Sequence, residues 1–288
     1  MNIVSIIVTY KSDLNALNKT ILTLKPQVSS IIIVNNDSQQ ILDFTDITVI
    51  NCEKNVGIAA AQNIGIREAF NRKADFILFS DQDTNFPVNY ITTLLGKLGK
   101  YKIEEIASIA PSFINLVNNQ ISYFYEIQNK KFIKSFYDKG IHEVFYTISS
   151  GQIIPVQALK KIGLMNELLF IDWVDIEWCI RAYNYGLKNL QDAETFIYHN
   201  LGDKNHSIKR MNIVKHSQLR NKYLIRNGEY LRLFSEFPNF QRKIIRNILI
   251  RNILGILITY KKNLIDELIL VKKSLRLGKL KKMGRIDE

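Results

Sequence analysis

Short apolar runs alternate with helix-like segments through the first hundred residues. Four runs rich in β-branched and aromatic residues are too short for helices and end in polar residues, as strands do. These expected strands are residues 3–10, 31–34, 48–50 and 76–80. Between them, residues 13–24 carry leucine and isoleucine at helical spacing, and a second helix is expected from Ile58 to Phe70. Strands that are apolar on both faces and alternate with helices predict an α/β fold with a mostly parallel sheet, flanking helices and right-handed crossovers.

The remainder of the chain has a different pattern. Residues 101–160 are less regular and predict mixed or antiparallel strands, while residues 159–168 and 173–185 have the spacing of helices. From Lys209 onward the pattern is that of long, basic, amphipathic helices. The expected interruptions of these helices lie near Gly228, Pro238 and Gly255.

The composition is that of a globular protein. Hydrophobic residues make up 47% of the chain and charged residues 23%, which argues against disorder. Two cysteines, Cys52 and Cys179, are too few for a disulfide framework and suggest a reducing compartment. The N-terminal apolar run is short and lacks a basic segment before it, and no stretch reaches the roughly 20 apolar residues of a membrane-spanning helix. We therefore expect neither a signal peptide nor a transmembrane span.

The net charge of +12 is concentrated in the C-terminal part of the chain. From Lys209 to Arg285 there are 20 lysines and arginines and four acids, a balance of +16. Subtracting +16 from +12 leaves −4 for the other residues. Basic amphipathic helices fit an anionic membrane surface, but charge runs are also typical of solvated or self-associating helices.

Polar residues follow three of the expected strands at the point where each strand ends. Thr9 and Tyr10 close the first strand. The second is followed by Asn35, Asn36 and Asp37, and the fourth by Asp81 and Asp83. In open parallel sheets ligands bind outside the carboxyl ends of the strands, so these side chains would line one crevice. Each strand end alone is more typical of a turn than of a site. Together they predict a nucleotide site in which the Tyr10 ring stacks on a base.

Asp81 and Asp83 enclose a glutamine in the sequence FILFSDQDT, residues 76–84. Two carboxylates at this spacing repel each other unless a cation neutralises them. Mg²⁺ takes a few carboxylate oxygens from a protein and shares its other positions with substrate phosphates and water. A D-x-D pair is frequent by chance, but its place at the end of a buried strand predicts a divalent metal site.

A second acidic cluster lies at residues 170–178 (FIDWVDIEW), which contain both tryptophans of the chain. If this segment is helical, Asp172 and Asp175 lie on one face. Burial beside the indoles would raise a carboxylate pKa and favour proton acceptance. The alternative is a set of acids that only stabilises the start of a helix. Upstream, the small residues of the loop 149–155 (SSGQIIP) would let a ligand approach closely.

The other motifs are weaker or absent. His199 follows the strand-like run TFIY and could ligate the metal or contact a pyrophosphate, although a lone histidine is equally a structural residue. No His/Cys cluster has the spacing of a zinc site. The motifs G-x-S-x-G, Walker A and G-x-G-x-x-G are missing, which argues against serine hydrolases, P-loop NTPases and dinucleotide oxidoreductases.

These motifs resemble those of the family-2 inverting glycosyltransferases of GT-A type. Within that family the pattern is most similar to the bacterial rhamnosyltransferases that use dTDP-L-rhamnose. The long match LLFIDWVDIEWCIRA is the most specific, and the D-x-D pair is the least specific. The matching segments, between residue 3 and about residue 227, are IVTYK, IIIVNNDS, NVGIAAAQNIGI, FSDQD, SSGQIIP, IGLMNELLFIDWVDIEWCIRAYNYG, HNLGD and RNKYLIRN.

The resemblance implies roles for individual residues. Asp175 falls at the position of the family's catalytic base, and Asp81 and Asp83 form the motif that binds the metal and the diphosphate, with His199 as a further candidate ligand. The implied cofactor is Mg²⁺ or Mn²⁺. The residues implied to hold the nucleotide sugar are Thr9, Tyr10, Asn35, Asn36, Asp37, Asn55, Gly57, Asn63 and Asp81. Those implied to hold the acceptor or the sugar are Gly151, Asp172, Trp173, Glu177, Trp178, Arg220 and Tyr223.

One position departs from the family pattern. The turn after the second strand usually reads V-D-N-x-S, and here Asn35 stands in place of the aspartate. The family's base-reading carboxylate is therefore missing at this position, and Asp37 is the candidate to replace it.

The reaction that the resemblance implies is an inverting, metal-dependent transfer of L-rhamnose to a saccharide acceptor of a surface polysaccharide such as O-antigen or capsule. Asp175 would accept the proton of the attacking hydroxyl while the metal stabilises the departing diphosphate. The implied organisation is a GT-A catalytic domain at residues 1–208 and a basic helical extension at 209–288. Within the first, residues 1–100 would bind the nucleotide and 101–208 the acceptor.

The expected partners are a nucleotide-sugar donor and a saccharide acceptor that is lipid-linked. Such an acceptor would place the protein in the cytoplasm, peripheral on the inner face of the bacterial plasma membrane, with the basic extension against anionic lipid. Self-association of the extension into a homo-oligomer is the alternative.

Three other functions are compatible with part of the sequence. A family-2 transferase could use a UDP-hexose donor instead. A nucleotidyltransferase also uses paired aspartates and a metal, but VTYKSD contains no Gly-rich basic loop. A nucleic-acid-binding protein would explain the isoelectric point near 9.5. It would not explain carboxylates at strand ends, which repel phosphate, so we expect no nucleic-acid partner.

Overall fold

The structure is a computed structural model that describes residues 1–115, 120–199, 217–260 and 263–286. Its contacts divide the chain into two compact units. The first unit comprises Met1–Glu126, Ile133–Asn166 and Val174–Asn200, and the second comprises Ile127–Phe132, Glu167–Trp173 and Leu201–Glu288. The domain boundary expected at residue 208 lies outside the described residues, so that assignment stays a prediction.

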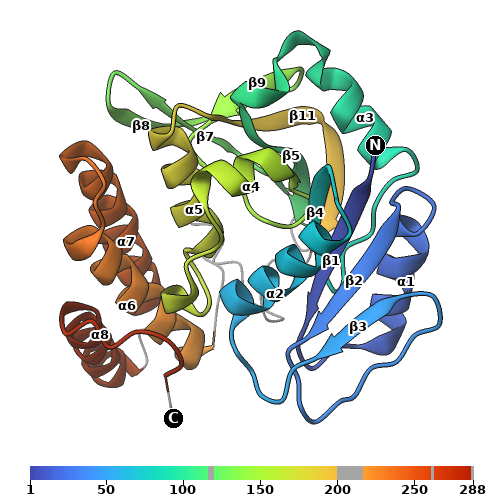
Figure 1. Cartoon of the computed structure of the whole chain (residues 1–288). Coiled ribbons are helices and arrows are strands. Elements are labelled where there is room, and N and C mark those ends of the chain that lie inside the picture. Colours follow the sequence, from blue (N-terminus) through green and yellow to red (C-terminus); the bar gives the residue numbers. More distant parts are fainter. Residues whose placement is uncertain (116–119, 200–216, 261–262, 287–288) are drawn as a thin grey trace. The chain divides into compact units, whose positions relative to one another are not determined.

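Among the described residues, nine strands form one sheet in the first unit. The order is β3-β2-β1-β4-β10-β5-β11-β9, with β6 paired to β5 outside this path (Figure 1). The four strands expected in the first hundred residues are all present and parallel to one another. They are β1 (Ile3–Thr9), β2 (Ser30–Asn35), β3 (Thr48–Asn51) and β4 (Phe76–Asp81).

The other half of the sheet is mixed, as the irregular pattern of residues 101–160 predicts. β10 is antiparallel to both β4 and β5, whereas β11 is parallel to β5. β9 is antiparallel to β11, and β6 is antiparallel to β5. β7 and β8 form a separate two-stranded sheet. The bounds are β5 (Ile106–Asn115), β6 (Gln120–Ile121), β7 (Phe124–Gln128), β8 (Lys131–Ser135), β9 (Ile141–Val144), β10 (Ile153–Pro155) and β11 (Lys188–His199).

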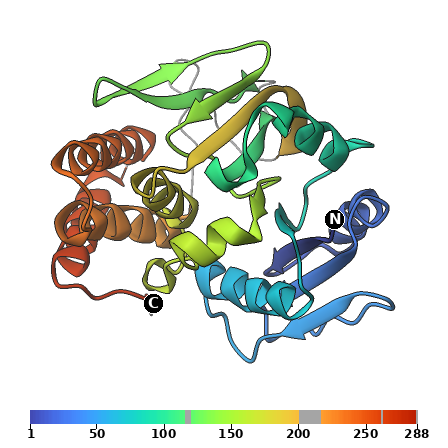
Figure 2. The same cartoon turned by 45° about the horizontal axis from the view of Figure 1, so that its top comes forward.

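Helices cover both faces of this sheet (Figures 1 and 2). α1 (Leu14–Leu24) and α3 (Tyr90–Gly96) share one apolar core with Ile3 and Ile7 of β1. On the other face of β1, Ile6 meets Gly65 of α2, where an added Cβ would lie 2.5 Å from the Ile6 side chain. The small residue therefore lets α2 approach the sheet closely. The helices on this second face are α2 (Ile58–Asn71), α4 (Val156–Ile162) and α5 (Val174–Asn184).

Two of the expected helix boundaries are wrong. The helix expected at residues 159–168 is α4, which ends earlier because Gly163 takes a φ of 92°. The helix expected at 173–185 is α5, which begins at Val174. Asp172 precedes it with a φ of 62°, in the left-handed region. Asp172 and Asp175 therefore do not share a helical face, contrary to the expectation.

The second unit contains the long basic helices that the C-terminal pattern predicts. They are α6 (Gln218–Phe234), α7 (Asn239–Thr259) and α8 (Leu264–Lys279). Pro238 lies between α6 and α7 as expected, but Gly228 and Gly255 lie inside helices rather than interrupting them. The apolar core of this unit is formed by Ile225, Leu249, Ile256, Leu270 and Val271. Among the described residues, no helix is both long and apolar enough to cross a membrane.

A buried ion pair fixes the irregular middle of β11. The register of β11 against β5 shifts between Gln191 and Phe196, and Asp192 lies fully buried within this bulge. Its carboxylate accepts hydrogen bonds from the Lys97 ammonium at 2.7 Å and from a backbone N–H within the bulge. Burial alone would lower the pKa of Lys97, but its hydrogen bonds with Asp192 and Glu194 outweigh burial and raise that pKa above its ordinary value.

Replacing Lys97 with methionine would leave the buried Asp192 carboxylate without its cation. We expect the free energy of unfolding to fall by about 3 kcal/mol near neutral pH. Because the pKa of Lys97 is raised, its contribution is complete at neutral pH and is lost only as the pH rises through that raised value. Urea denaturation measures the change. Lys100→Met, at an exposed position of the same short helix (Lys97–Lys100), is the matched control, and equal losses in both variants would contradict the prediction.

Candidate active site

Buried side chains join the carboxyl ends of β1 and β2. The Thr9 hydroxyl donates a hydrogen bond to Asn35 Oδ1 at 3.1 Å, and both residues are fully buried. The Asn35 amide nitrogen reaches Asn51 Oδ1 at 2.8 Å, the Asp37 carbonyl at 3.2 Å and the Gln40 carbonyl. An ionised aspartate has no donor for these acceptors. The departure of Asn35 from the family pattern therefore has a structural reason.

The turn after β2 meets the segment that leads into α2. Asn36 Oδ1 accepts a hydrogen bond from the Val56 N–H at 2.8 Å. The adjacent Asn55 accepts one from the Gly57 N–H at 2.9 Å, and Gly57, with a φ of 88°, precedes the helix. Asp37 is buried in the same turn. The structure thus brings these four predicted nucleotide-binding residues together at the edge of the sheet.

Asn63 lies elsewhere, inside α2. Its side-chain amide exchanges two hydrogen bonds of 2.9 Å with the backbone of Met165, one as donor and one as acceptor. It is fully buried in this contact. Its described contacts tie α2 to the segment after α4, and its predicted contact with the nucleotide stays a prediction.

Gln82, the residue between the two aspartates, extends the sheet with its side chain. Its Oε1 accepts a hydrogen bond from the Tyr10 N–H at 2.9 Å, and its Nε2 donates one to the Tyr10 carbonyl at 3.3 Å. β1 and β4 pair up to Val8 and Asp81, so this amide continues their pairing beyond the last backbone partners. Asp81 is half-buried there, while Asp83 and the Tyr10 ring are exposed.

Two hydrogen bonds connect the residue after the D-x-D pair to the loop before β10, and that loop to Asp175. The Thr84 and Ser150 hydroxyls lie 2.9 Å apart. The neighbouring Ser149 donates its backbone N–H to Asp175 Oδ2 at 3.3 Å. Oδ1 of Asp175 accepts the N–H of Ile176 at 2.8 Å, in the first turn of α5, where the helix dipole favours a negative charge. Two acidic motifs about ninety residues apart in sequence are thereby connected within one unit.

The loop that makes this connection is fixed to β4 by its backbone. The Gly151 N–H donates to the Phe79 carbonyl at 2.8 Å, and the Phe79 N–H donates to the Gln152 carbonyl at 3.0 Å. Gly151 has a φ of 76°, and an added Cβ would lie 2.7 Å from the Tyr90 hydroxyl oxygen. The position therefore requires glycine for the fold, and its predicted role in binding the acceptor or the sugar stays a prediction.

The arrangement of acids and amides at the ends of parallel strands has counterparts in known proteins. A model of the family described as "Glycosyl transferase family 2" matches residues 5–163, more than half of the chain. The chain belongs to glycosyl transferase family 2. The family that the sequence motifs predict is therefore confirmed, and the protein is a glycosyltransferase.

Relatives of this family-2 glycosyltransferase are found among both sequences and structures. A dTDP-rhamnosyl transferase of Shigella flexneri, RfbF, is 36% identical over 241 residues, which cover 79% of this chain and 78% of that protein. The structure of S. aureus TarS 1–349 has a TM-score of 0.56 and 14% identity, and covers 91% of this chain and 74% of TarS 1–349. That of GalNAc-T7 has a TM-score of 0.56 and 12% identity, over 80% of this chain.

These structural likenesses show the fold. The chain spans 48% of the GalNAc-T7 structure and 43% of a longer TarS structure, so both neighbours extend well beyond it. The expected fold class, a mostly parallel GT-A-type sheet with flanking helices and a helical C-terminal region, is confirmed.

Asp81 and Asp83 are the residues of this family-2 transferase that would hold a divalent cation. Among the described residues there is no group of three or more His, Cys, Asp or Glu side chains that could hold a metal ion. Two carboxylates without a third protein ligand do not suit an all-protein cage. They do suit a hard cation that takes its other ligands from substrate phosphates and water.

The predicted role of His199 is not tested, because its side chain lies outside the described residues. Its backbone pairs with Asn115 at the end of β11. The preceding residue, Tyr198, forms a β-bridge with Asn85, two residues beyond Asp83. The backbone before His199 therefore runs beside the segment that follows the D-x-D pair.

In the second unit, α6 holds the segment before α5 in an unusual backbone conformation. Phe170, Asp172 and Trp173 have φ values of 64°, 62° and 69°, which non-glycine residues rarely adopt. The Asn227 amide donates to the carbonyls of Leu169, Ile171 and Asp172 at 2.7, 2.8 and 3.1 Å. The Trp173 indole donates to the carbonyl of Leu224, also on α6, at 2.9 Å. These bonds offset the cost of the left-handed residues.

Two further predicted acceptor residues, Arg220 and Tyr223, belong to the same contact. Arg220 forms an ion pair with Asp172 at 3.1 Å. The Tyr223 ring stacks on Phe170 with 5.1 Å between centroids, and its hydroxyl accepts the Ile286 N–H at 2.8 Å. The structure thus brings Asp172 next to Arg220 of α6, with Tyr223 of the same helix against Phe170, and the role of these residues in binding an acceptor stays a prediction.

A buried arginine joins the residues after α8 to this segment. Arg226 is fully buried, and burial lowers its pKa to about 10. Its guanidinium donates to the Gly284 carbonyl at 2.7 Å and to the Leu169 carbonyl at 3.3 Å. Gly284 in turn donates its N–H to the Leu168 carbonyl at 2.9 Å. We call residues 284–286 the closing strap of the second unit.

Glu177 and Trp178, also predicted to bind acceptor or sugar, are buried inside α5. Burial raises the pKa of Glu177, and the charge and hydrogen bonds of Arg181, at 2.8 Å, oppose the shift. Arg181 also donates to two backbone carbonyls at the end of α4, and Trp178 Nε1 donates to the Gly163 carbonyl at 2.9 Å. The described contacts of both residues hold α4 and α5 together, and a direct role toward the acceptor stays untested.

Three residues that the sequence motifs do not single out hold this edge of the sheet together. Gln82, Thr84 and Ser150 supply the side-chain hydrogen bonds that connect β1, β4 and the loop before β10. In the sequence, Gln82 and Thr84 can be recognised only by position, because Gln82 lies within the D-x-D pair and Thr84 directly follows it. Ser150 lies in a loop that the sequence marks as small, but its partner is 66 positions away.

The two cysteines differ in accessibility and acidity. Cys179 is fully buried in α5, and burial raises its pKa to about 12. Cys52 follows β3, is half-buried, and has a pKa that burial also raises. We expect iodoacetamide near pH 8 to alkylate Cys52 in the folded protein well before Cys179, because alkylation needs an accessible thiolate. Peptide mass spectrometry with a urea-unfolded control measures both rates, and equal rates in the folded protein would contradict the prediction.

Proposed function

We propose that this glycosyltransferase moves L-rhamnose from dTDP-L-rhamnose to a saccharide acceptor, with inversion at the anomeric carbon and with Mg²⁺ or Mn²⁺ as cofactor. The observation that carries the proposal is the pair of hydrogen bonds, Thr84 with Ser150 and Ser149 with Asp175, on either side of one short loop. They link the segment after the D-x-D pair, the proposed diphosphate-binding motif, to the proposed base.

The donor is supported by both the site and the relatives. The Tyr10 ring is exposed and directly follows Thr9, whose carbonyl accepts the N–H of Asn36 in the β2 turn, and this ring is proposed to stack on the base. The Shigella relative is named a dTDP-rhamnosyl transferase, which supports dTDP-L-rhamnose. A TarS structure of 16% identity contains UDP-GlcNAc, and GalNAc-T7 is described with UDP, GalNAc and Mn²⁺. A UDP-hexose donor is therefore the alternative.

Asp175 is proposed to act as the base. Its two oxygens accept the backbone N–H groups of Ser149 and Ile176, which orient the carboxylate. The acceptor oxygen attacks the anomeric carbon, its proton passes to Asp175, and the bond from that carbon to the diphosphate oxygen breaks. A divalent cation held by Asp81 and Asp83 would supply positive charge for the departing diphosphate.

The acceptor is proposed to be a lipid-linked saccharide of a surface polysaccharide, such as O-antigen or capsule. This would place the enzyme on the inner face of the bacterial plasma membrane. The support is the basic balance of +16 between Lys209 and Arg285, which suits an anionic surface. The same proposal assigns catalysis to residues 1–208 and the basic extension to residues 209–288.

The donor and the metal can be tested by release of nucleoside diphosphate with water in place of the acceptor. We expect release from dTDP-L-rhamnose to be at least about tenfold faster than from UDP-glucose or UDP-galactose, since specificity here rests on base and sugar contacts. EDTA should stop the reaction, and excess Mg²⁺ or Mn²⁺ should restore it. Faster release from a UDP-hexose would replace the donor, and unchanged release in EDTA would remove the metal.

Replacing Asp175 with asparagine keeps the shape of the side chain but removes the proton acceptor. We expect turnover with a saccharide acceptor to fall roughly 1,000-fold, a typical value for loss of a general base. Binding of dTDP-L-rhamnose, measured by calorimetry, should stay within about twofold, because Asp175 does not hold the nucleotide. Asp138→Asn, at an exposed position of the same unit, is the matched control. Turnover retained in Asp175→Asn would exclude Asp175 as the base.

A further inference from the structure

The outer faces of α7 and α8 carry apolar side chains that no described element covers. Seven large aliphatic residues on these two helices are between 39% and 74% exposed. Those of α7 follow one another at intervals of four, so they form one stripe. The residues are Ile250, Leu254 and Ile258 on α7, and Leu264, Ile265, Leu268 and Ile269 on α8.

Basic residues continue the exposed face of each helix at one end. On α7, the exposed Lys243 and Arg246 precede Ile250 on the same side of the helix. On α8, Lys272, Lys273 and Arg276 follow Ile269 and are likewise exposed. The order is therefore basic to apolar along α7, and apolar to basic along α8.

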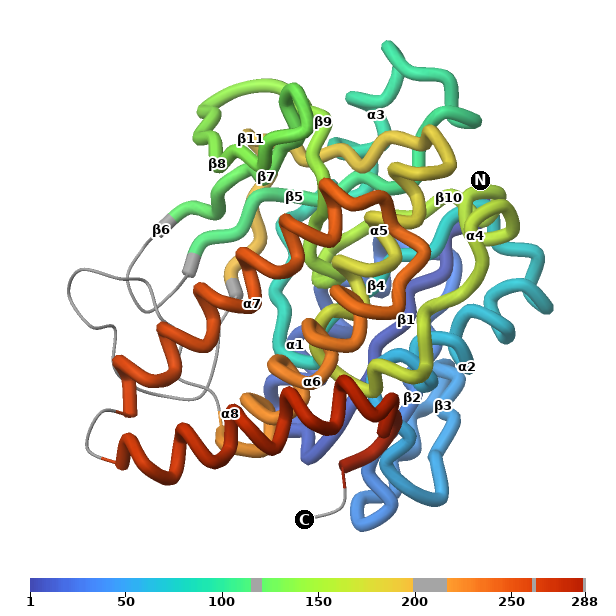
Figure 3. The backbone as a smooth tube through the Cα atoms, turned by 90° about the vertical axis from the view of Figure 1, so that its left-hand side faces the viewer, coloured from blue at the N-terminus to red at the C-terminus, as the bar shows by residue number. Residues whose placement is uncertain are grey.

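The arrangement of the helices brings the apolar halves together. α7 and α8 both pack on α6 and contact each other, and in Figure 3 they flank it. The end of α7 lies close in sequence to the start of α8, and the two helices converge there and diverge toward their basic ends (Figure 3). An apolar zone is thus bordered by positive charge along both helices. We call this surface the α7–α8 face.

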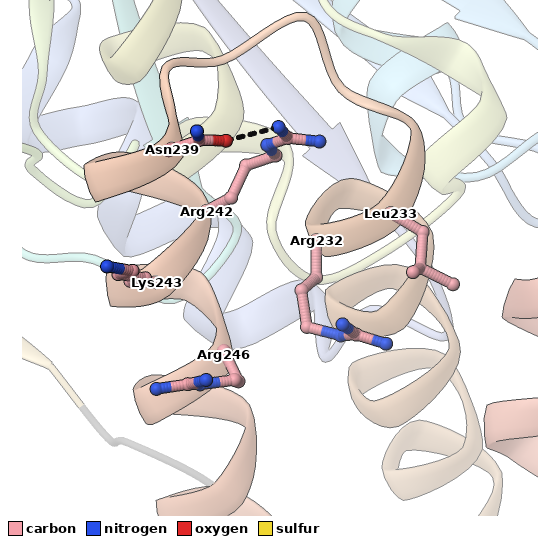
Figure 4. Close-up of a pocket in the computed structure, with 6 residues that line it drawn as sticks. All are labelled: Arg232, Leu233, Asn239, Arg242, Lys243 and Arg246. Atoms are coloured by element: carbon pink, nitrogen blue, oxygen red, sulfur yellow. Dashed lines mark hydrogen bonds between the residues drawn. The ribbon is translucent and has the colours of Figure 1, made fainter.

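A groove between α6 and α7 lies at the basic end of α7 and is lined mainly by cationic residues. It has a volume of about 300 Å³, and four of the six residues that line it are cationic (Figure 4). Arg232 is compensated by Glu229, with two hydrogen bonds of 2.8 Å, and Arg242 donates to Asn239. The lining residues are Arg232, Leu233, Asn239, Arg242, Lys243 and Arg246.

The remaining positive charge of the groove has no acidic partner in the described chain. Lys243 and Arg246 form no ion pair among the described residues. Clustered cations of this kind repel one another unless an anion binds. The guanidinium fork suits phosphate oxygens in particular. Ile250 follows Arg246 by four residues, about 6 Å along the helix, so a phosphate held here would lie beside apolar surface.

A ligand that presents phosphate next to hydrocarbon is a phospholipid surface. A second copy of the chain fits less well, because the exposed charges of α7 and α8 are cationic except for Asp266, and two such faces would repel each other. Nucleic acid would place phosphates against the apolar stripe. We propose that the α7–α8 face docks on an anionic lipid bilayer, with headgroup phosphates at the groove and the aliphatic side chains in the acyl boundary. This inference rests on the proposed function in one respect, because the lipid-linked acceptor is the reason for the enzyme to bind a bilayer.

The charge contribution is tested by co-sedimentation with vesicles of phosphatidylcholine, with and without phosphatidylglycerol. We expect the wild-type chain to partition at least about tenfold more strongly to the anionic vesicles than to those of phosphatidylcholine alone. The variant Arg242→Gln, Lys243→Gln, Arg246→Gln should partition at least about tenfold more weakly, since each cation near such a surface contributes severalfold. The control Lys19→Gln, Lys100→Gln, Lys161→Gln removes the same charge from exposed positions of the first unit and should stay within about twofold of wild type.

The apolar contribution is tested at high salt, where the electrostatic part is screened. The variant Leu254→Gln, Ile265→Gln, Ile269→Gln should lose the residual binding that wild type retains. The control Leu22→Gln, Ile41→Gln, Val88→Gln changes residues of the first unit that are 71–86% exposed and should retain it. Circular dichroism and thermal unfolding establish that both variants remain folded.

Several results would overturn the proposal. They are absence of wild-type binding to anionic vesicles, equal weakening by a variant and its control, and displacement from vesicles by duplex DNA at matched ionic strength. A dimer in light scattering that the apolar variant converts to a monomer would show a self-association face instead. Donor hydrolysis without vesicles should be unchanged in all variants. A wrong donor would therefore overturn the proposed function alone, and an active enzyme that ignores vesicles would overturn the docking face alone.

Discussion

The backbone hydrogen bonds of the sheet end at the carboxyl end of β1, so Thr9 and Tyr10 need other partners there. The geometry of the candidate nucleotide site depends on those partners. Thr9 is bound on one side by the Asn35 amide, and Tyr10 on the other side by the Gln82 amide. Amides suit this task because each can donate and accept at the same place, which a carboxylate cannot. The two acids of the D-x-D pair are thereby positioned by the neutral residue between them, and the Tyr10 ring is presented at the surface by a backbone held on both its N–H and its carbonyl.

The same edge is continued by the loop that precedes β10. Because Gly151 binds β4 through its backbone and Ser149 binds Asp175, any shift of this loop would move the candidate base relative to the D-x-D pair. The geometry of the candidate site is in this way set within the first unit. The second unit contributes a different kind of surface, in which charge and apolar area are distributed along helices and no single residue dominates. The two proposals, a transferase site and a lipid-docking face, thus rest on separate parts of the chain.

The regular half of the fold could be predicted from the sequence because its signals are local. Each of the first four strands is a short apolar run, and the acids that end β4 follow from reading along one strand. The conformation before α5 could not be predicted, because the carbonyls of Leu169, Ile171 and Asp172 are held by Asn227, more than fifty positions later, and the segment has no periodic pattern. The roles of Gln82 and Ser150 cannot be predicted from the sequence for the same reason, since both depend on partners from distant segments. The basic groove combines residues of two helices and has no counterpart in either helix alone.

The closing strap has a practical consequence for handling the protein. Gly284 and Ile286 follow the last helix, yet their backbone groups bind Arg226, Leu168 and Tyr223, which surround the segment before α5. Truncation of the protein at the end of α8 would remove no described helix or strand. It would leave a protein whose buried guanidinium has lost a carbonyl acceptor and whose left-handed segment has lost a backbone partner. Shortened versions for crystallisation should therefore keep the strap, and an affinity tag is better appended beyond it than put in its place.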